Sequence, residues 1–267
     1  MPVILRADRL IGVSLLALLG LSLGLAAPDA PAQTPDGRRS GYHDMGKSLQ
    51  AMQDDDTANP GMLWVQEGAQ LWTQRTGAAG KACADCHAGA TAMAGVAARY
   101  PAFDAKLGRP LDLEQRISQC RSEHQQAAPV AADDRAALAL VAYVAYQSRG
   151  QPIAPPDDQR LRPFVEAGEA LFKGRQGQLN LACSQCHDDN PGRKLGGATI
   201  PQAHPTGYPI YRLEWQSLGS LKRRLRNCLV GMRAEPYAPE APEYVALELF
   251  LMRRAAGMKL EAPAVRP

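Results

Sequence analysis

The sequence is poor in several features that would fix its function class at once. Its 267 residues carry a net charge of +3 and contain no long block of Lys or Arg, so nothing indicates binding to nucleic acid. Aromatic residues make up only 6% of the chain, and its cores must use Leu, Ala and Val, which favours helices over sheets. Six cysteines are too few for a disulfide-stapled scaffold of this size, although three bridges would be possible.

Long apolar runs are also missing, except for one at the N-terminus over residues 10–27, which follows two arginines. The sequence Ala30-Pro31-Ala32 comes next, and small residues in this spacing are typical of a signal-peptide cleavage site. We therefore predict a signal peptide over residues 1–32 and export to the periplasm, where no membrane span remains after processing. A retained membrane anchor is the alternative.

Four of the six cysteines belong to two Cys-x-x-Cys-His motifs, at residues 83–87 and 183–187. In this pattern two thiols add to the vinyl groups of a haem and the adjacent histidine binds its iron. A thioredoxin-like redox motif or a zinc site would leave the adjacent histidines unexplained. We predict two covalently attached haem c groups. The residues that would hold them are Cys83, Cys86 and His87 for the first and Cys183, Cys186 and His187 for the second.

The sequence around the two motifs repeats. Gly68 corresponds to Gly168 at an offset of 100, and further along Tyr100 corresponds to Tyr208 at an offset of 108. The second copy therefore has eight extra residues between the haem motif and Tyr208. These observations predict an all-α fold of two tandem cytochrome c-like domains related by duplication.

The predicted boundaries follow from the repeat and from a linker rich in Pro and Gly. We expect an N-terminal arm over residues 33–60, a first domain over 61–150, a linker over 151–158 and a second, catalytic domain over 159–267. Each domain should end in an apolar helix, near residues 133–148 and 242–256.

Each haem iron also needs a ligand on its other face. Met93, Cys120 and His124 are candidates in the first domain, and Cys228 and Met232 in the second. Cysteine alone occupies equivalent positions in both copies, so it is the predicted ligand of both irons. A disulfide between the two cysteines is the alternative. A thiolate ligand would lower the reduction potential and keep a nucleophilic sulfur at the iron.

Cations gather near the second of these cysteines. Five lie between Lys222 and Arg233, and Arg224 would lie one helical turn before Cys228. We predict that Arg224, Lys222 and Arg233 bind an anionic substrate beside Cys228, whose sulfur could be an iron ligand, a nucleophile or both. Pairing of these cations with haem propionates, or a plain surface role, is the alternative, since Arg116 repeats the position of Arg224.

The segment over residues 224–236 reads Arg-x-x-x-Cys-x-x-Gly-Met-Arg-Ala-Glu-Pro and resembles the active-site segment of SoxA, the dihaem subunit of SoxAX cytochromes. Residues 207–216 are also similar to that family, and the organisation matches over the whole chain after residue 32. The resemblance implies L-cysteine S-thiosulfotransferase activity, in which thiosulfate is joined oxidatively to a cysteine of a SoxYZ carrier protein. It also implies that Cys228 and Arg224 are the catalytic residues, with Cys228 in persulfide form and Arg224 binding the substrate.

The same resemblance implies a SoxX-like c-type cytochrome as a second subunit and a soluble cytochrome as electron acceptor. The first haem lacks the basic cluster, so we predict a structural or electron-transfer role for it. The main alternative is a dihaem electron carrier without a catalytic site, in which Met232 would bind the second iron. A dihaem peroxidase, which needs an open iron, is a further alternative.

Overall fold

The computed structural model describes Pro2 and residues 36–267, and the latter belong to one compact unit. Apart from Pro2, the predicted signal peptide lies outside the described residues, as does the start of the predicted arm. No helix within residues 36–267 is long and apolar enough to cross a membrane.

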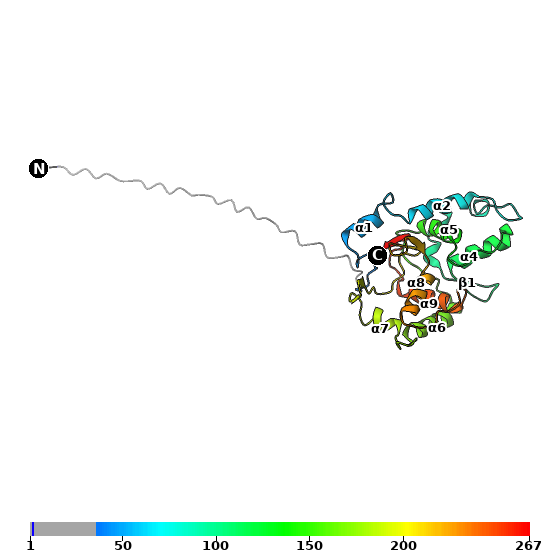
Figure 1. The fold of residues 1–267 in the computed structure, drawn as a ribbon. Helices are drawn as coiled ribbons and strands as arrows, with labels where there is room; N and C mark the ends of the chain where they lie inside the picture. The colour runs from blue at the N-terminus through cyan, green and yellow to red at the C-terminus, as the bar shows by residue number, and fades with distance from the viewer. Residues whose placement is uncertain (1, 3–35) are drawn as a thin grey trace. The chain divides into compact units, whose positions relative to one another are not determined.

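Helices form most of the regular structure, and their order follows the predicted duplication (Figure 1). The two final apolar helices, α5 and α9, lie within two residues of their predicted bounds. The α-helices are α1 (Lys47–Asp54), α2 (Met62–Thr73), α3 (Ala84–His87), α4 (Leu113–Cys120), α5 (Arg135–Tyr146), α6 (Arg162–Lys173), α7 (Cys183–His187), α8 (Leu221–Gly231) and α9 (Pro242–Arg254). Short 3₁₀-helical segments are η1 (Ala90–Met93), η2 (Ala97–Arg99) and η4 (Gln159–Leu161), and η3 (Arg121–Gln125) is a short π-helix.

Each copy is built on a crossed pair of helices, α2 with α5 in the first and α6 with α9 in the second. A glycine stands at each crossing. A Cβ added at Gly68 would lie 2.1 Å from the carbonyl oxygen of Ala139, and one added at Gly168 would lie 2.1 Å from that of Ala246. Only glycine allows two helix backbones to approach so closely, which explains why this residue stands at both equivalent positions.

The all-α prediction is correct only in part, because each copy also contains a short antiparallel hairpin. The hairpins β1–β2 and β5–β6 lie between the haem motif and the following cysteine helix, and β7 adds to β5 in parallel. A further hairpin, β3–β4, follows the second motif. The strands are β1 (Ala102–Asp104), β2 (Arg109–Leu111), β3 (Lys194–Leu195), β4 (Ala198–Thr199), β5 (Ile210–Arg212), β6 (Ser217–Gly219) and β7 (Ala264–Arg266). Strands of two or three residues are too short to show a sequence period.

The hairpins lead directly into the helices that carry Cys120 and Cys228. Asp112 caps α4 by accepting a hydrogen bond from the backbone N–H of Gln115, and Ser220 caps α8 by accepting one from that of Arg223. Short polar side chains at this position satisfy the free N–H groups of a first helical turn. The same device therefore sets the start of the cysteine helix in both copies.

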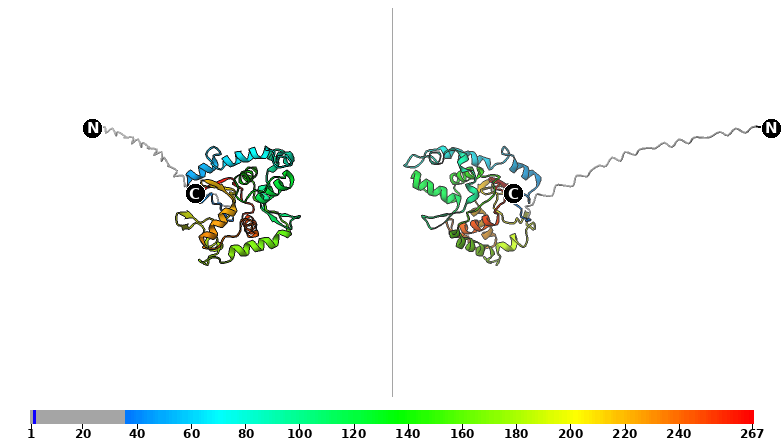
Figure 2. Two further views of the ribbon diagram at one scale, coloured as in Figure 1. Left: turned by 45° about the vertical axis from the view of Figure 1, so that its right-hand side comes forward. Right: turned by 180° about the vertical axis from the view of Figure 1, so that it is seen from behind.

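The two copies share a hydrophobic core. Trp72 and Leu140 of the first copy belong to the same buried cluster as Met252 and Met258 of the second. The predicted linker is hydrogen-bonded to the second copy, since the N–H of Ile153 donates to the carbonyl oxygen of Met258 at 2.8 Å. In both views of Figure 2, α1 and α2 lie at one edge of the described unit and α6 lies at the opposite edge.

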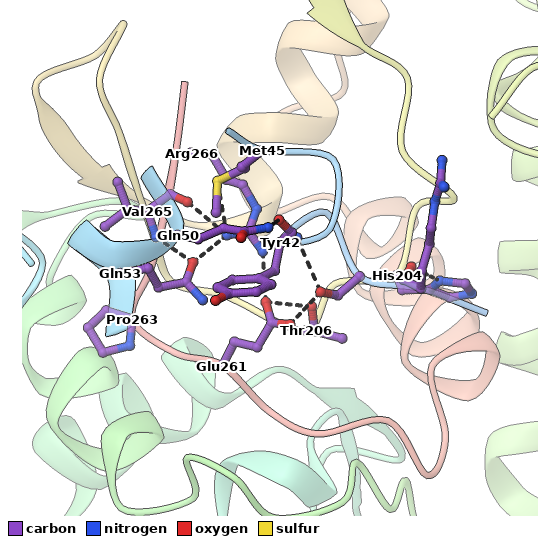
Figure 3. Close-up of polar contacts among 12 residues, drawn as sticks. Tyr42, Met45, Gln50, Gln53, His204, Thr206, Glu261, Pro263, Val265 and Arg266 are labelled. Atoms are coloured by element: carbon purple, nitrogen blue, oxygen red, sulfur yellow. Dashed lines mark hydrogen bonds and ion pairs between the residues drawn. The ribbon is translucent and has the colours of Figure 1, made fainter. Parts of the chain in front are cut away.

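The predicted arm packs against the C-terminal end of the chain, where α1 contacts β7 (Figure 1). The Oε1 atom of Gln53 accepts the N–H of Val265 at 3.1 Å, and the Nδ2 group of Asn59 donates to the carbonyl oxygen of Pro263 at 3.0 Å. Figure 3 shows the hydrogen bond between Gln53 and Val265, with Arg266 and Glu261 beside it. The arm thereby becomes part of the second copy.

Candidate functional site

The first haem motif lines a cavity of about 500 Å³. Cys83, Cys86 and His87 lie on its wall with Cys120, from the last residue of α4. Much of the remaining wall is apolar and includes Trp72, Leu113, Ile117, Leu140 and Val144. Three arginines also line it: Arg99, Arg116 and Arg121. A haem is a flat apolar ring with two propionates, so two thiols, an imidazole, an apolar wall and nearby cations fit this group.

In the second motif, His187 is oriented by the backbone. Its Nδ1 lies 2.7 Å from the carbonyl oxygen of Pro201, which leaves Nε2 with the free lone pair, an arrangement typical of metal-binding histidines. Burial lowers the pKa of His187 and keeps the imidazole neutral, as a metal ligand must be. Phe172 stacks on this ring with centroids 6.4 Å apart, and Trp72 contacts His87 at 5.8 Å in the first copy.

Each remaining cysteine lies beside the motif of its own copy. Burial raises the pKa of Cys120, and the nearby Cys86 thiol contributes to the same shift. Burial likewise raises the pKa of Cys183 to about 11, and the neighbouring Cys228 adds to it. All six cysteines are free, so the alternative of a disulfide between Cys120 and Cys228 is not present.

The other candidate iron ligands have different surroundings in the two copies. Met93 and His124 line the first cavity together with Cys120. Met232 is buried in a core cluster with Leu229 and Tyr244, against which Cys183 also packs. The cysteines remain our predicted ligands, because they alone are equivalent in both copies.

The predicted cationic cluster is divided between different faces of α8. Lys222 is buried, and its Nζ lies 3.2 Å from Asp112 Oδ2 and 3.8 Å from Glu114 Oε2 of the first copy. Burial opposes the charge on Lys222, but these carboxylates raise its pKa. The predicted substrate contact of Lys222 is therefore wrong, because its ammonium group is held by two carboxylates.

Arg233 lies exposed beyond the end of α8, with a positive φ of 54°. Its carbonyl oxygen accepts the N–H of Gln178 at 3.1 Å. It is not among the residues that line the cavity next to Arg224. The structure thus separates the three cations that were predicted to act together.

Arg224 lines a cavity of about 310 Å³ on the second copy. Three further cationic side chains line the same cavity: Lys194, Arg212 and Arg266. The carboxylate of Asp44 and the phenol of Tyr208 also line it. The cavity is built from the arm, the β3–β4 hairpin, the loop over residues 201–208, the β5 strand, helix α8 and the C-terminal end of the chain. Arg212 is not among the site residues predicted from the sequence, although the offset of 108 pairs it with Asp104 and so marks a reversal of charge between the copies.

Electrostatic interactions connect this cavity to Cys228. Burial raises the pKa of Tyr208 to about 12, with Arg224 opposing and Cys228 adding to the shift. Burial also lowers the pKa of Arg212, and the nearby charge of Arg224 lowers it further. The cavity therefore combines a neutral phenol and two guanidinium groups that interact electrostatically with one another, and Tyr208 and Arg212 also interact with Cys228, which does not itself line the cavity.

The arm closes one side of the cavity. Arg266 Nη2 lies 2.7 Å from Glu261 Oε2, and the hydroxyl of Ser40 bonds to the other oxygen of that carboxylate. The backbone carbonyl of Tyr42 accepts a hydrogen bond from Gln50 at 3.0 Å (Figure 3). His204, on the same cavity wall, bonds through Nδ1 to the carbonyl oxygen of Arg39 at 3.0 Å, and burial lowers its pKa.

Comparison with known proteins gives the same family throughout. A model of the SoxA/TsdA cytochrome c domain matches residues 67–153 and again residues 167–260. The L-cysteine S-thiosulfotransferase subunit SoxA of Pseudaminobacter salicylatoxidans is 40% identical over 214 residues, which cover 79% of this chain and 75% of that protein. The subunit of the same name from Rhodovulum sulfidophilum is 34% identical over 85% of this chain and 80% of its own length.

The solved structure of SoxXA from P. pantotrophus shares the fold with a TM-score of 0.83 and 29% sequence identity, over 86% of this chain and 87% of that one. Its likeness covers both copies, as the family model does. The double match, the shared fold and the 40% identity together establish that the chain belongs to the SoxA family of cytochromes c.

Proposed function

We propose that this chain is the catalytic subunit of an L-cysteine S-thiosulfotransferase, the activity in the names of its relatives. The observation that carries the proposal is the cationic cavity lined by Arg224, one helical turn before Cys228. Thiosulfate is a dianion with a reactive outer sulfur. A guanidinium group holds such an anion through charge-assisted hydrogen bonds, and Cys228 supplies a sulfur atom within the same region.

Membership of a cytochrome c family implies covalently bound haem c, which accepts electrons one at a time when bound. The free thiols, the oriented His187 and the apolar first cavity support two such groups. We propose that the first haem is attached to Cys83 and Cys86, with His87 and Cys120 as its axial ligands. The second would be attached to Cys183 and Cys186, with His187 and Cys228 as its axial ligands.

The net reaction forms one sulfur–sulfur bond. A thiol of the carrier protein and thiosulfate react as R–SH + S₂O₃²⁻ → R–S–S–SO₃⁻ + H⁺ + 2e⁻. The proton leaves from the carrier thiol, and the two electrons pass in succession to a soluble cytochrome. The chain's own residues must therefore hold the anion, align two sulfur atoms and exclude competing nucleophiles.

Cys228 is the proposed intermediate carrier of the sulfur. Its sulfur, in persulfide form, bonds to the outer sulfur of thiosulfate with loss of two electrons. The thiolate of the carrier protein then attacks that outer sulfur, and the Cys228 persulfide leaves, as in thiol–disulfide exchange. Arg224 holds the sulfonate group during both steps and stabilises the negative charge of the departing sulfur.

The partners follow from the same proposal. A SoxX-like c-type cytochrome would form the second subunit, as the likeness to SoxXA supports. A SoxYZ-like protein would supply the acceptor cysteine, and the complex would work in the periplasm after removal of residues 1–32. The first copy would have a structural or electron-transfer role.

Replacement of the two equivalent cysteines tests the proposal. We expect Cys228→Ala to abolish formation of the carrier thiosulfonate, measured by mass spectrometry of the carrier, while Cys120→Met keeps most of the activity. Optical spectra should show that both haem groups are still attached in each variant. A comparable collapse in Cys120→Met, or full activity in Cys228→Ala, would contradict the proposal.

A further inference from the structure

The two copies carry opposite charges at one pair of equivalent positions. Asp104 is the last residue of β1, and Arg212 is the last residue of β5. The helices that follow carry an arginine at equivalent positions as well, Arg116 on α4 and Arg224 on α8. The fold therefore places a carboxylate in the first copy where it places a guanidinium group in the second.

In the first copy the arginine is neutralised within the protein. Arg116 Nη2 lies 2.8 Å from Asp104 Oδ2, and Arg116 Nη1 donates to the side-chain oxygen of Gln119 at 2.8 Å. Asp104 is only 6% exposed, so solvent screens this pair weakly. An anion from solution would have to displace Asp104 in order to reach Arg116.

In the second copy the equivalent arginine has no such partner. No carboxylate among residues 36–267 lies within ion-pair distance of Arg224. Arg212 pairs with Glu214 at 3.0 Å and donates through Nε to an oxygen of the terminal carboxyl group of Pro267 at 3.0 Å. Both arginines line the same cavity of about 310 Å³.

Two charged side chains on the cavity wall are already paired with other residues. Asp44, on its wall, is paired with Arg39 at 3.0 Å, and Arg266 is paired with Glu261. The Nζ of Lys194 donates a hydrogen bond to the hydroxyl of Thr199 at 2.8 Å. Two neighbouring guanidinium groups repel each other unless an anion lies between them, so this cavity favours a small anion.

We propose that Arg212 is a second thiosulfate-binding residue, which holds the sulfonate group together with Arg224. The inference rests on the proposed function and adds to it a reason why only the second copy binds substrate. Arg212 occupies the place of the carboxylate that fills the equivalent site in the first copy. Glu214 competes with the substrate for Arg212 and so limits the affinity.

The test is to restore the carboxylate of the first copy with Arg212→Asp. This variant should pair internally with Arg224 and raise the KM for thiosulfate by about 100-fold, while Arg212→Ala should raise it by about tenfold, in keeping with one lost charge-assisted hydrogen bond. Glu214→Gln should change KM in the opposite direction, because it frees Arg212. Equilibrium dialysis with thiosulfate should show the same order of affinities without turnover.

Arg226→Ala is the matched control, since Arg226 lies on the same helix but lines a different cavity, with Tyr237 and Tyr244. Its KM for thiosulfate should stay within about twofold of the wild-type value. The reduction potential of the second haem should be the same in Arg212→Ala as in the wild type. A shifted potential with unchanged KM would overturn the proposal and assign Arg212 to a haem propionate.

The outcomes also separate this inference from the proposed function. If the wild-type protein fails to join thiosulfate to the carrier, the proposed function is wrong. If the wild type is active and Arg212→Asp has the wild-type KM and thiosulfate affinity, the inference alone is wrong.

Discussion

Lys222 and Arg224 are two residues apart on α8 but have different electrostatic environments. The ammonium of Lys222 is surrounded by carboxylates of the first copy, whereas Arg224 borders a cavity rich in cations. Side chains two residues apart on an α-helix point to nearly opposite sides of it. A count of cations along the sequence therefore overestimated the charge available to a substrate, and the burial of each side chain decides which cation can bind.

Lys222→Met should destabilise the protein without affecting the binding of thiosulfate. The substitution leaves Asp112 and Glu114 buried without their cation, which typically costs about 3–5 kcal/mol. Urea unfolding monitored by circular dichroism would measure the change in the free energy of unfolding. Lys106→Ala is the control, because its pair with Glu123 is largely exposed and should contribute less than about 1 kcal/mol. A stable Lys222→Met variant with a raised KM for thiosulfate would contradict this account.

At the scale of elements, the sequence predicts the helices well and the hairpins poorly. The bounds of α5 and α9 follow from long apolar stretches with helical periodicity, and the motifs mark α3 and α7 directly. The hairpins β1–β2 and β5–β6 have strands of three residues, which give no period. The arm is polar and its packing on β7 depends on contacts with residues about 200 positions away, which no local pattern reveals.

The same limit applies to the candidate site. The haem motifs, Cys120, Cys228 and Arg224 are recognisable from spacing and repetition alone. Arg212 and Lys194 come from two different hairpins, and only the tertiary fold brings them to the same cavity as Arg224. Alignment of the two copies position by position would have found Arg212, whereas Lys194 lies in the part that the first copy lacks.

Gly168→Ala should weaken the crossing of α6 and α9. The new Cβ would lie 2.1 Å from the carbonyl oxygen of Ala246, and backbone atoms cannot move away as a flexible side chain can. We expect a loss of about 1–3 kcal/mol in the free energy of unfolding. Gly231→Ala, at the end of α8, meets no atom within 4 Å and should be neutral or slightly stabilising. Equal stabilities of the two variants in urea titration would show that the crossing tolerates a wider separation.

At the scale of the whole molecule, a buried ionic cluster joins the two copies. Glu248 of α9 faces Asp112, Glu114 and Lys222. Burial raises the pKa of Glu248 to about 8 and that of Glu114 to about 7, against the opposing effect of Lys222. The folded protein thus holds protons on these carboxyl groups at pH values where the unfolded chain has lost them.

The stability of the protein should therefore fall as the pH rises from about 5 to about 8. A carboxyl group with a raised pKa in the folded state stabilises the fold at low pH, and this contribution is lost as the pH passes through the folded-state value. We expect a loss of roughly 1–3 kcal/mol over this range. Glu248→Gln should flatten the dependence, as measured by urea unfolding at pH 5 and pH 8. A steeper dependence in the variant would show that another group controls it.

Duplication followed by divergence accounts for the asymmetry of the molecule. Both copies keep the crossed helices, the haem motif, the hairpin and the cysteine helix, but only the second has the β3–β4 hairpin, the β7 strand and an arginine without a carboxylate partner. These three additions surround one cavity. This asymmetry supports our proposal that the chemistry takes place in the second copy, at the sulfur of Cys228.

The mass of the peptide that contains Cys228 tests this assignment most directly. In protein isolated without reductant, we expect an additional mass of about 32 Da on Cys228, from one extra sulfur, and none on Cys120. Treatment with thiosulfate and an oxidised cytochrome should add the sulfonate-bearing sulfur to the same peptide. An unmodified Cys228 thiol under both conditions, with the second iron bound by Met232, would contradict the account.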